Sequence, residues 1–466
     1  FLSKMGEVSS MKHFGALAVL AFGLALLAGC SQGGQPAQSG APAGPTTALQ
    51  GPFYTAVMQE RAAQGSGNGK AFYSLEWKQD GTKLIRAADY ASMRETYLCS
   101  APSCAHNSET CTAWLPADGG MCTLYALPDK LLVLCQPAQG SPHLDVMQLD
   151  GRDKTTLYTF PDGSRIDEGA VYNESGIVLK VTQARQNETT VSEAQQLVHI
   201  SFDGGAACTV YEIENENSDV LAQGHTTLFL REATDAGLLI KTVSMGASGA
   251  ADPLMGEEEI GQMLDSQMAS TVYTISLLPY SGGQPETLLS FSAGQCVEYA
   301  SREALFYFQK DANGISLHKV DLKTKQDAVL IANCEQTPLC GTSELFTIDS
   351  LVPLYVVDDC LMVNTFQDQT VDAAQNIINT HTMYAVNTGN GEMKEVALYN
   401  NYDASRRPVL IYDTVENGSL LVEAQVQEID KGPEMGRVVQ KTLGIISAQD
   451  YLNSVPNYQL IAPLGE

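Results

Sequence analysis

The stretch CTLYALPDKLLVLCQPAQGSPHLDVMQLDGRDKTTLYTF, residues 122–160, decides the fold. It holds four short apolar runs that start at Cys122, Lys130, Leu144 and Thr155, and the segments between them are rich in Gly, Pro, Asp and Gln. Short runs of alternating apolar residues that are joined by turn-forming residues are typical of antiparallel β-strands. The stretch therefore predicts a sheet of four antiparallel strands.

The same order of strands recurs along the chain at intervals of roughly 40 to 60 residues. Pairs of runs around a polar turn start at Leu144, Leu197, Thr271, Ile315 and His381, and each pair follows another apolar run. Four antiparallel strands in such a repeat are the pattern of a β-propeller blade. Residues 51–466 are therefore predicted to form an all-β domain, a propeller of about seven four-stranded blades. Six or eight blades, or two tandem β-sandwiches, are the alternatives.

One passage, DPLMGEEEIGQMLDSQM from Asp252, predicts a helical insert in this β domain. Asp252 suits the N-cap, Pro253 suits the first turn, and the acidic residues that follow lie where the helix dipole favours negative charge. Four apolar residues then share one face of the helix, namely Ile260, Met263, Leu264 and Met268. Such a face either docks on the propeller or, as a Met-rich surface, adapts to a partner.

The amino-terminal region has the features of an export signal. Lys12 and His13 precede an apolar run from Phe14 to Leu27, which is too short to span a bilayer. The run ends in Leu-Ala-Gly-Cys at Cys30, and these residues resemble the bacterial lipobox. The resemblance implies that residues 1–29 are a signal peptide that is removed, with an over-extended reading frame before Met11, and that Cys30 carries lipid.

Residues 30–50 are rich in Gly, Pro, Ser, Ala and Gln, a composition that predicts a flexible linker. The chain is thus expected at the extracytoplasmic face of the cell membrane, anchored by its lipid. Its formal net charge of −27 argues against nucleic acid as a partner, because an acidic surface repels phosphates.

A group of residues that could bind a metal ion or form a disulfide lies in YLCSAPSCAHNSETCTAW. Its members, Cys99, Cys104, His106 and Cys111, are close together in the sequence. Three thiolates and an imidazole are a ligand set for tetrahedral zinc, although the spacing matches neither a zinc knuckle nor a zinc ribbon. The alternatives are a disulfide from Cys99 or Cys104 to Cys111, with the odd thiol pairing with Cys122, or reduced thiols without a role.

The remaining cysteines divide into two kinds. Cys334 and Cys340 flank a short loop and are candidates for a disulfide. The others lie in strand-like runs, where a free cysteine is usually a small buried apolar residue: Cys135, Cys208, Cys296 and Cys360.

The connections between runs differ in length. Within each unit the links from first to second run are short, as in LPDK from Leu127. The second-to-third links are expected to be long loops, and they include QPAQGSPH from Gln136, ARQNETTVSEAQQ from Ala184, the helical insert, DQTVDAAQNIINT from Asp368 and QEIDKGPEMG from Gln427. The cysteine group and the Cys334–Cys340 loop lie between units. Alternate connections of an antiparallel blade emerge on opposite faces, so the long connections are expected on one face, which is then the expected binding face.

The sequence contains no HExxH, GxSxG, phosphate-loop or dinucleotide motif. The repeat pattern resembles the TolB-like and YncE-like propellers of bacterial surface lipoproteins, without a catalytic residue to carry over. The sequence thus favours a non-catalytic binding or scaffolding propeller for a saccharide, peptide, other small molecule or protein. An extracellular hydrolase or lyase, or a metal-binding module that uses the cysteine group, are the alternatives.

Overall fold

The computed structural model describes residues 48–464 except 100, 102, 187–190, 217–223, 248–256, 342–345, 372–376, 403–404 and 431–436. The predicted signal peptide, the lipidation site Cys30 and most of the predicted linker therefore lie outside the described residues.

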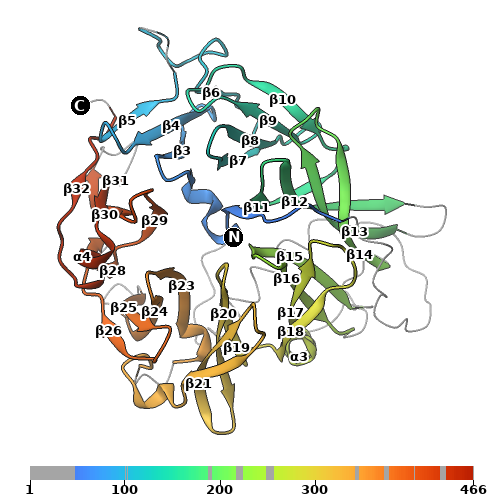
Figure 1. Ribbon diagram of the computed structural model, residues 1–466, viewed down its shortest axis with the longest axis vertical. Coiled ribbons are helices and arrows are strands. Elements are labelled where there is room, and N and C mark those ends of the chain that lie inside the picture. The colour runs from blue at the N-terminus through green and yellow to red at the C-terminus, as the bar shows by residue number, and fades with distance from the viewer. Residues whose placement is uncertain are drawn as a thin grey trace.

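Seven antiparallel sheets stand around a central axis, and the first strand of each sheet is nearest to the axis (Figure 1). Blade 1 consists of β2 (Ser66–Gly67), β3 (Ala71–Trp77), β4 (Lys83–Asp89) and β5 (Arg94–Tyr97), with β6 (Trp114–Leu115) beside β4. Blade 2 consists of β7 (Met121–Ala126), β8 (Leu131–Gln136), β9 (His143–Met147) and β10 (Thr155–Thr159). Blade 3 consists of β11 (Arg165–Tyr172), β12 (Gly176–Gln186), β13 (Val191–Ser201) and β14 (Ala207–Glu216).

The second half of the ring repeats this plan. Blade 4 consists of β15 (His225–Ala233), β16 (Gly237–Met245), β17 (Val272–Pro279) and β18 (Glu286–Ser292). Blade 5 consists of β19 (Cys296–Ala300), β20 (Ala304–Asp311), β21 (Gly314–Asp321) and β22 (Asp327–Ile331). Blade 6 consists of β23 (Leu351–Val357), β24 (Cys360–Val371), β25 (Ile377–Asn387) and β26 (Met393–Glu395). Blade 7 consists of β29 (Ile411–Thr414), β30 (Leu420–Asp430), β31 (Arg437–Ile446) and β32 (Gln459–Leu460).

The predicted seven-bladed propeller is confirmed, and the four runs of residues 122–160 are the strands of blade 2. The second strand of that blade shows why the fold forms. Leu131, Leu132, Val133 and Leu134 in β8 are all fully buried, so apolar side chains on both faces of the strand pack against neighbouring blades. Each such side chain contributes about 1.5–3 kcal/mol through burial.

Residues 54–65, which we call the channel segment, run along the inner strands at the centre of the ring (Figure 1). Within it β1 (Tyr54–Val57) pairs with β11, and the short 3-10 helix η3 (Gln59–Gln64) follows. The Arg61 guanidinium donates to the Leu354 carbonyl of β23 at 2.6 Å and lies 4.8 Å from the centre of the Tyr355 ring. The segment therefore links the inner strands of blades 3 and 6 across the axis.

The ring closes through the carboxyl-terminal segment. Ala462 forms a parallel bridge with Arg94 of β5, and its carbonyl accepts the Glu95 N–H at 2.8 Å. Just before it, Ile461 is buried and donates to Leu443 of β31. The last residues thus join blade 7 to the outer strand of blade 1.

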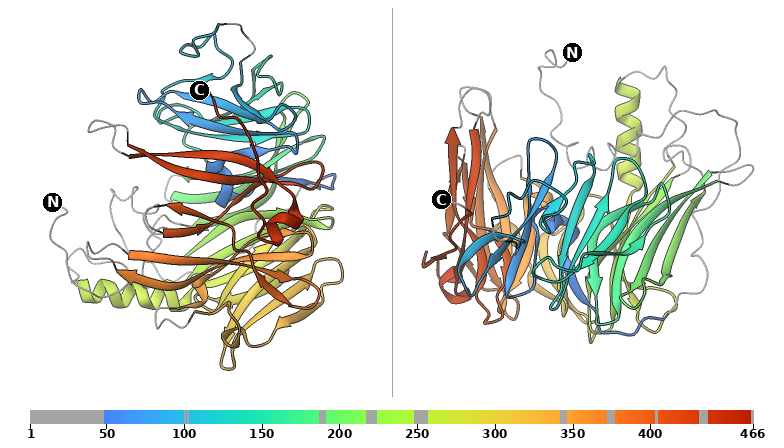
Figure 2. Two further views of the ribbon diagram at one scale, coloured as in Figure 1. Left: turned by 90° about the vertical axis from the view of Figure 1, so that its left-hand side faces the viewer. Right: turned by 90° about the horizontal axis from the view of Figure 1, so that it is seen from above.

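The two faces of the ring differ. We call the face that carries the second-to-third and blade-to-blade connections the elaborated face, and the other face the tight-turn face. The helix α3 (Glu257–Ser270) projects from the elaborated face between β16 and β17 (Figure 2). The link between blades 1 and 2, which carries the cysteine group, belongs to the same face because the strands alternate in direction.

Three links that were expected to be loops are instead extended hairpins. The strand pairs β12–β13, β24–β25 and β30–β31 continue their ladders far into these links. The ladder satisfies the backbone hydrogen bonds that a free loop would leave to water.

The separation of long and short connections between the two faces has an exception. The helix α4 (Ala448–Leu452) lies in the third-to-fourth link of blade 7, on the tight-turn face. A two-stranded sheet, β27 (Tyr399–Tyr402) with β28 (Ser405–Pro408), fills the link between blades 6 and 7.

Candidate functional site

The predicted cysteine group comes together in the structure. Cys99 follows β5, and the link then turns back so that Cys104, His106 and Cys111 join it, with one donor atom from each within 4.8 Å of the others. The Nδ1 atom of His106 lies 3.2 Å from the Cys111 Sγ. Cys111 is buried in the core between blades 1 and 2, whereas the other three residues are half-buried.

The backbone of the link holds this arrangement. Ser103 and His106 have positive φ values of 59° and 53°, which reverse the chain direction between the cysteines. The His106 N–H donates to the Cys104 Sγ at 3.4 Å, and the imidazole lies against the Tyr97 ring, 4.7 Å between centres. Tyr97 is itself held by a hydrogen bond from its hydroxyl to Glu76.

These four residues fit a tetrahedral metal ion. Thiolate and imidazole ligands at zinc distances are separated from one another by about 3.5–3.8 Å, which lies inside the 4.8 Å limit of this group. Burial acts to raise the pKa of Cys99, but hydrogen bonds from the Ala101 N–H and from the other thiols lower it overall. Burial raises the pKa of Cys111 to about 12. A cation would be needed to hold all three sulfurs as thiolates.

The ten cysteines within the described residues are all free thiols. Cys334 is buried in the short 3-10 helix η4 (Cys334–Gln336), and Cys340 is half-buried. The disulfide expected between these two residues stays a prediction. Cys135 and Cys296 are buried as expected, whereas Cys208 and Cys360 are half-buried.

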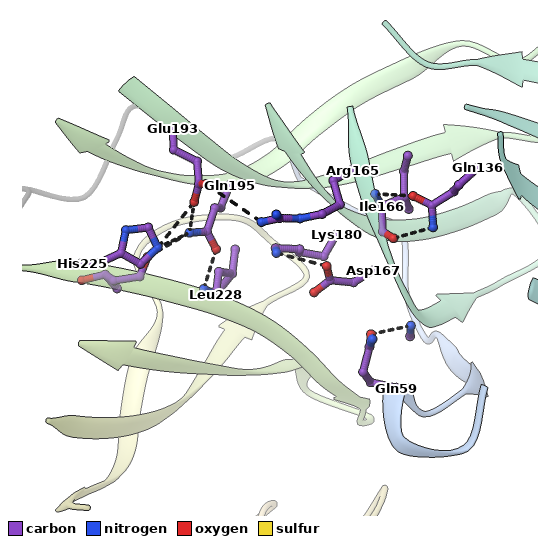
Figure 3. Close-up of polar contacts among 12 residues, drawn as sticks. Gln59, Gln136, Arg165, Ile166, Asp167, Lys180, Glu193, Gln195, His225 and Leu228 are labelled. Atoms are coloured by element: carbon purple, nitrogen blue, oxygen red, sulfur yellow. Dashed lines mark hydrogen bonds and ion pairs between the residues drawn. The ribbon is translucent and has the colours of Figure 1, made fainter. Parts of the chain in front are cut away.

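A second cluster of polar residues lies at the elaborated end of blades 3 and 4 (Figure 3). The register of β11 and β12 places Ile166 opposite Val181 and Ala170 opposite Leu179, so Asp167, Glu168 and Gly169 together face Lys180. Such a bulge redirects side chains and is frequent beside functional sites. We call this cluster the channel-mouth cluster, and its members are Arg165, Asp167, Glu168, Lys180, Glu193, Gln195 and His225.

The bulge is held by charged and amide groups. The Lys180 ammonium, almost fully buried, donates to the Asp167 carboxylate at 3.2 Å. Burial lowers the pKa of Lys180, against the effect of Asp167. The Gly169 N–H donates to the Gln59 side chain of the channel segment at 2.9 Å, so this segment is bonded to the bulge (Figure 3).

The outer part of the cluster spans two blades. Glu193 accepts from the Gln195 amide at 2.8 Å, lies 3.5 Å from the His225 Nε2 and is 4.0 Å from the exposed Arg165 guanidinium. Burial lowers the pKa of His225, partly offset by Glu193. His225 opens the inner strand of blade 4, while Glu193 lies in the third strand of blade 3.

Two buried hydroxyl groups near the bulge have unused hydrogen-bonding capacity. The Tyr125 hydroxyl on the inner strand of blade 2 is buried and has no hydrogen-bond partner among the described residues. Burial raises its pKa, and the nearby carboxylates of Glu168 and Asp167 add to this effect. The Thr182 hydroxyl, opposite Arg165 in the ladder, is also buried with no partner in the part of the chain that the structure describes. Burial and Asp167 raise the pKa of Glu168.

Sequence reasoning did not single out the channel-mouth cluster. The signal that could have revealed it is RIDEG from Arg165, which holds three charged residues where the first strand of blade 3 begins. The bulge that redirects them has no local sequence mark, and their partners come from other strands.

The helical insert is present as α3 from Glu257 onward, and the predicted cap residues Asp252 and Pro253 lie outside the described residues. Met263 and Met268 on this helix are half-buried, and the side chains of Ile260 and Leu264 are not among those described. Of the described residues, none belongs to a helix that is both long and apolar enough to cross a membrane.

No protein-family model and no curated protein sequence matches the chain. Solved structures that resemble it contain propellers. An oligogalacturonate lyase from Vibrio parahaemolyticus is 12% identical with a TM-score of 0.38, over 85% of this chain and 90% of that one. TolB from Acinetobacter baumannii is 10% identical with a TM-score of 0.28, over 83% and 78%. A prolyl endopeptidase is 9% identical with a TM-score of 0.47, and this chain spans about half its length (88% and 49%). Likenesses this distant assign no activity to the chain.

Proposed function

We propose that the chain is a lipid-anchored extracytoplasmic binding propeller whose ligand docks at the channel-mouth cluster on the elaborated face. One observation carries this proposal. The extended hairpins, α3 and the mixed-charge cluster at the inner strands of blades 3 and 4 all belong to the same face. Binding residues are commonly carried by loops and projections that a rigid scaffold holds in place.

The composition of the cluster favours a polar, uncharged or zwitterionic ligand, such as a saccharide or peptide. The Arg165 guanidinium offers donors and Glu193 offers acceptors. Gln195 is buried and links β13 to β15, because its side-chain amide donates to the Thr226 carbonyl and accepts from the Leu228 N–H.

The path of the amino-terminal segment supports an outward orientation of this face. The Leu49 N–H donates to the Tyr280 carbonyl at 2.7 Å, and the Asn173 amide donates to the Gln50 carbonyl at 2.5 Å. Both partners lie in turns of the tight-turn face, so the chain enters the propeller there. A linker from Cys30 would reach roughly 25 Å, which keeps the tight-turn face nearer the membrane and presents the elaborated face outward.

The experiment is a screen of the purified chain, residues 48–466, against saccharide and peptide arrays, with binding and turnover measured on every hit. Arg165→Ala and Glu193→Gln alter the rim of the cluster, while Arg152→Ala, in the tight-turn face, is the matched control. Binding without turnover that weakens at least tenfold in the rim variants supports the proposal. Turnover of a hit would favour the hydrolase or lyase alternative instead.

Anchoring has its own test. A Cys30→Ser variant should leave the membrane fraction, because a single unlipidated tether has no apolar surface to hold it. Retention of this variant in the membrane fraction would contradict the lipid anchor without touching the binding site.

A metal-binding role is the second candidate, and the four donors within 4.8 Å favour it. We infer that the group holds zinc, because three sulfurs and one imidazole form a closed set that suits structural zinc. Metal analysis of anaerobically purified protein should give one zinc per chain, lost in Cys104→Ser and kept in Cys208→Ser. A Cys99 or Cys104 link to Cys111 in mass spectra would contradict the metal site.

A further inference from the structure

Two cysteines outside the metal-ligand group lie side by side in blade 2. Cys122 in β7 and Cys135 in β8 are directly opposite each other in the antiparallel ladder. Their Sγ atoms are 3.7 Å apart, and the two residues are 8% and 3% exposed. Each of these thiols thus has the other as a buried neighbour.

The register suits a covalent bond between them. Directly opposite residues of an antiparallel pair have Cα atoms about 4.5–5.5 Å apart, inside the range that a disulfide spans. The sulfurs already lie at van der Waals contact, so a bond requires side-chain rotation rather than a change of register.

The other cysteines of this core do not compete for Cys122 or Cys135. Cys99, Cys104 and Cys111 pack in the same core between blades 1 and 2 but converge on His106. This division uses all five thiols of that core. Cys122, which was expected to pair with the odd thiol of the metal-ligand group, therefore has Cys135 on the neighbouring strand as its neighbour instead.

We propose that Cys122 and Cys135 form a disulfide across β7 and β8 when the chain meets a disulfide oxidant. One cysteine thiolate attacks the oxidant's disulfide and releases one of its thiolates, and the other cysteine then displaces the remaining half. The two cysteines lose two protons and two electrons, and the disulfide of the oxidant is reduced to two thiols. In cells this step rests on the proposed export of the chain, since the oxidant belongs to an oxidising compartment.

The competing use of Cys135 is as a metal ligand. Cys135, His143 and Asp145 have donor atoms within 4.8 Å of one another. However, Asp145 already pairs with the Lys154 ammonium at 3.2 Å and accepts from the Thr156 hydroxyl at 2.8 Å. Because these interactions engage the Asp145 carboxylate, a bond from Cys135 to Cys122 is favoured over a metal ion held by Cys135, His143 and Asp145.

The test uses purified chain, residues 48–466, equilibrated with oxidised glutathione, then denatured, alkylated without reductant and digested. The expected product is a peptide pair joined between Cys122 and Cys135, lighter by two hydrogen atoms than the separate thiols. The link should disappear in Cys122→Ala and in Cys135→Val, and remain in Cys296→Ser, which alters another buried cysteine. The oxidised wild type should also melt several degrees above its reduced form.

Three results would overturn the proposal: alkylation of both thiols after oxidation, a link from Cys122 to Cys99, Cys104 or Cys111, or a bound metal that is lost in Cys135→Val. A parallel arm isolates the full chain from cells with free thiols trapped by alkylation. If the purified chain forms the link and the cellular chain does not, the thiol pair is supported and the proposed export is contradicted. The two claims are therefore separable.

Discussion

At the scale of single residues, Glu232 couples stability to pH. This buried carboxyl at the end of β15 accepts hydrogen bonds from the Thr55 hydroxyl of the channel segment and from the Ala233 N–H. Burial raises its pKa from 4.5 to about 7, against the opposing effects of these hydrogen bonds and of Arg302 and Arg231. The folded protein therefore retains a proton that the unfolded chain releases.

The sign of the effect follows directly. Between pH 4.5 and about 7 the native state binds more protons, so the free energy of unfolding falls as pH rises through this window. Glu232→Gln keeps an oxygen for both hydrogen bonds and removes the titration. Between pH 4 and pH 8 the free energy of unfolding of the wild type should fall by about 3 kcal/mol relative to that of the variant. Urea unfolding of both proteins at both pH values measures this difference. Glu303→Gln, which alters an exposed carboxyl, is the control. If stability changes equally with pH in Glu232→Gln and wild type, the expected role of Glu232 is wrong.

Residue-level prediction was uneven for physical reasons. Cys99, Cys104, His106 and Cys111 are close in sequence and lie in one link, so their convergence could be predicted from spacing alone. The pairing of Cys122 with Cys135 depends on strand register, and the Asp167–Lys180 contact depends on a bulge. Neither register nor bulge is encoded by local composition.

At the scale of elements, the channel segment should act as a brace between blades. Arg61 in η3 stacks over the Tyr355 ring and donates to the Leu354 carbonyl. Arg61→Ala removes both contacts and leaves that carbonyl without this donor, which should lower the free energy of unfolding by about 2 kcal/mol. Chemical denaturation measures the loss, and Arg152→Ala, on an exposed turn, should change stability by less than about 0.5 kcal/mol. An Arg61 variant as stable as this control would show that the brace contributes nothing.

The element-level expectations held where hydrophobic periodicity is strong. The four runs of residues 122–160 are strands, and EEEIGQMLDSQMAS is the helix α3. The long links of blades 3, 6 and 7 were expected to be loops because they separate the second and third apolar runs of their units. They form ladders because each hairpin supplies its own backbone partners, whatever its side chains contact.

At the scale of the whole molecule, ring closure depends on a few carboxyl-terminal residues. Removing residues 459–466 deletes β32, the buried Ile461 and the bridge from Ala462 to Arg94. We expect a loss of about 3–5 kcal/mol, because a buried apolar side chain and several backbone hydrogen bonds disappear together. Thermal unfolding by circular dichroism measures it, and removal of residues 465–466 alone is the control. An unchanged melting temperature would mean that the ring does not need this closure.

The whole ring serves, in the proposed function, to hold a ligand at its elaborated face. The most direct measurement is the affinity, by titration calorimetry, of an array-identified ligand for wild type, Arg165→Ala, Glu193→Gln and the tight-turn control Arg152→Ala. We predict that both rim variants bind at least tenfold more weakly while the control binds like wild type, because Arg165 and Glu193 form the accessible rim of the cluster. Equal affinity in all four proteins, or a loss confined to Arg152→Ala, would contradict the account.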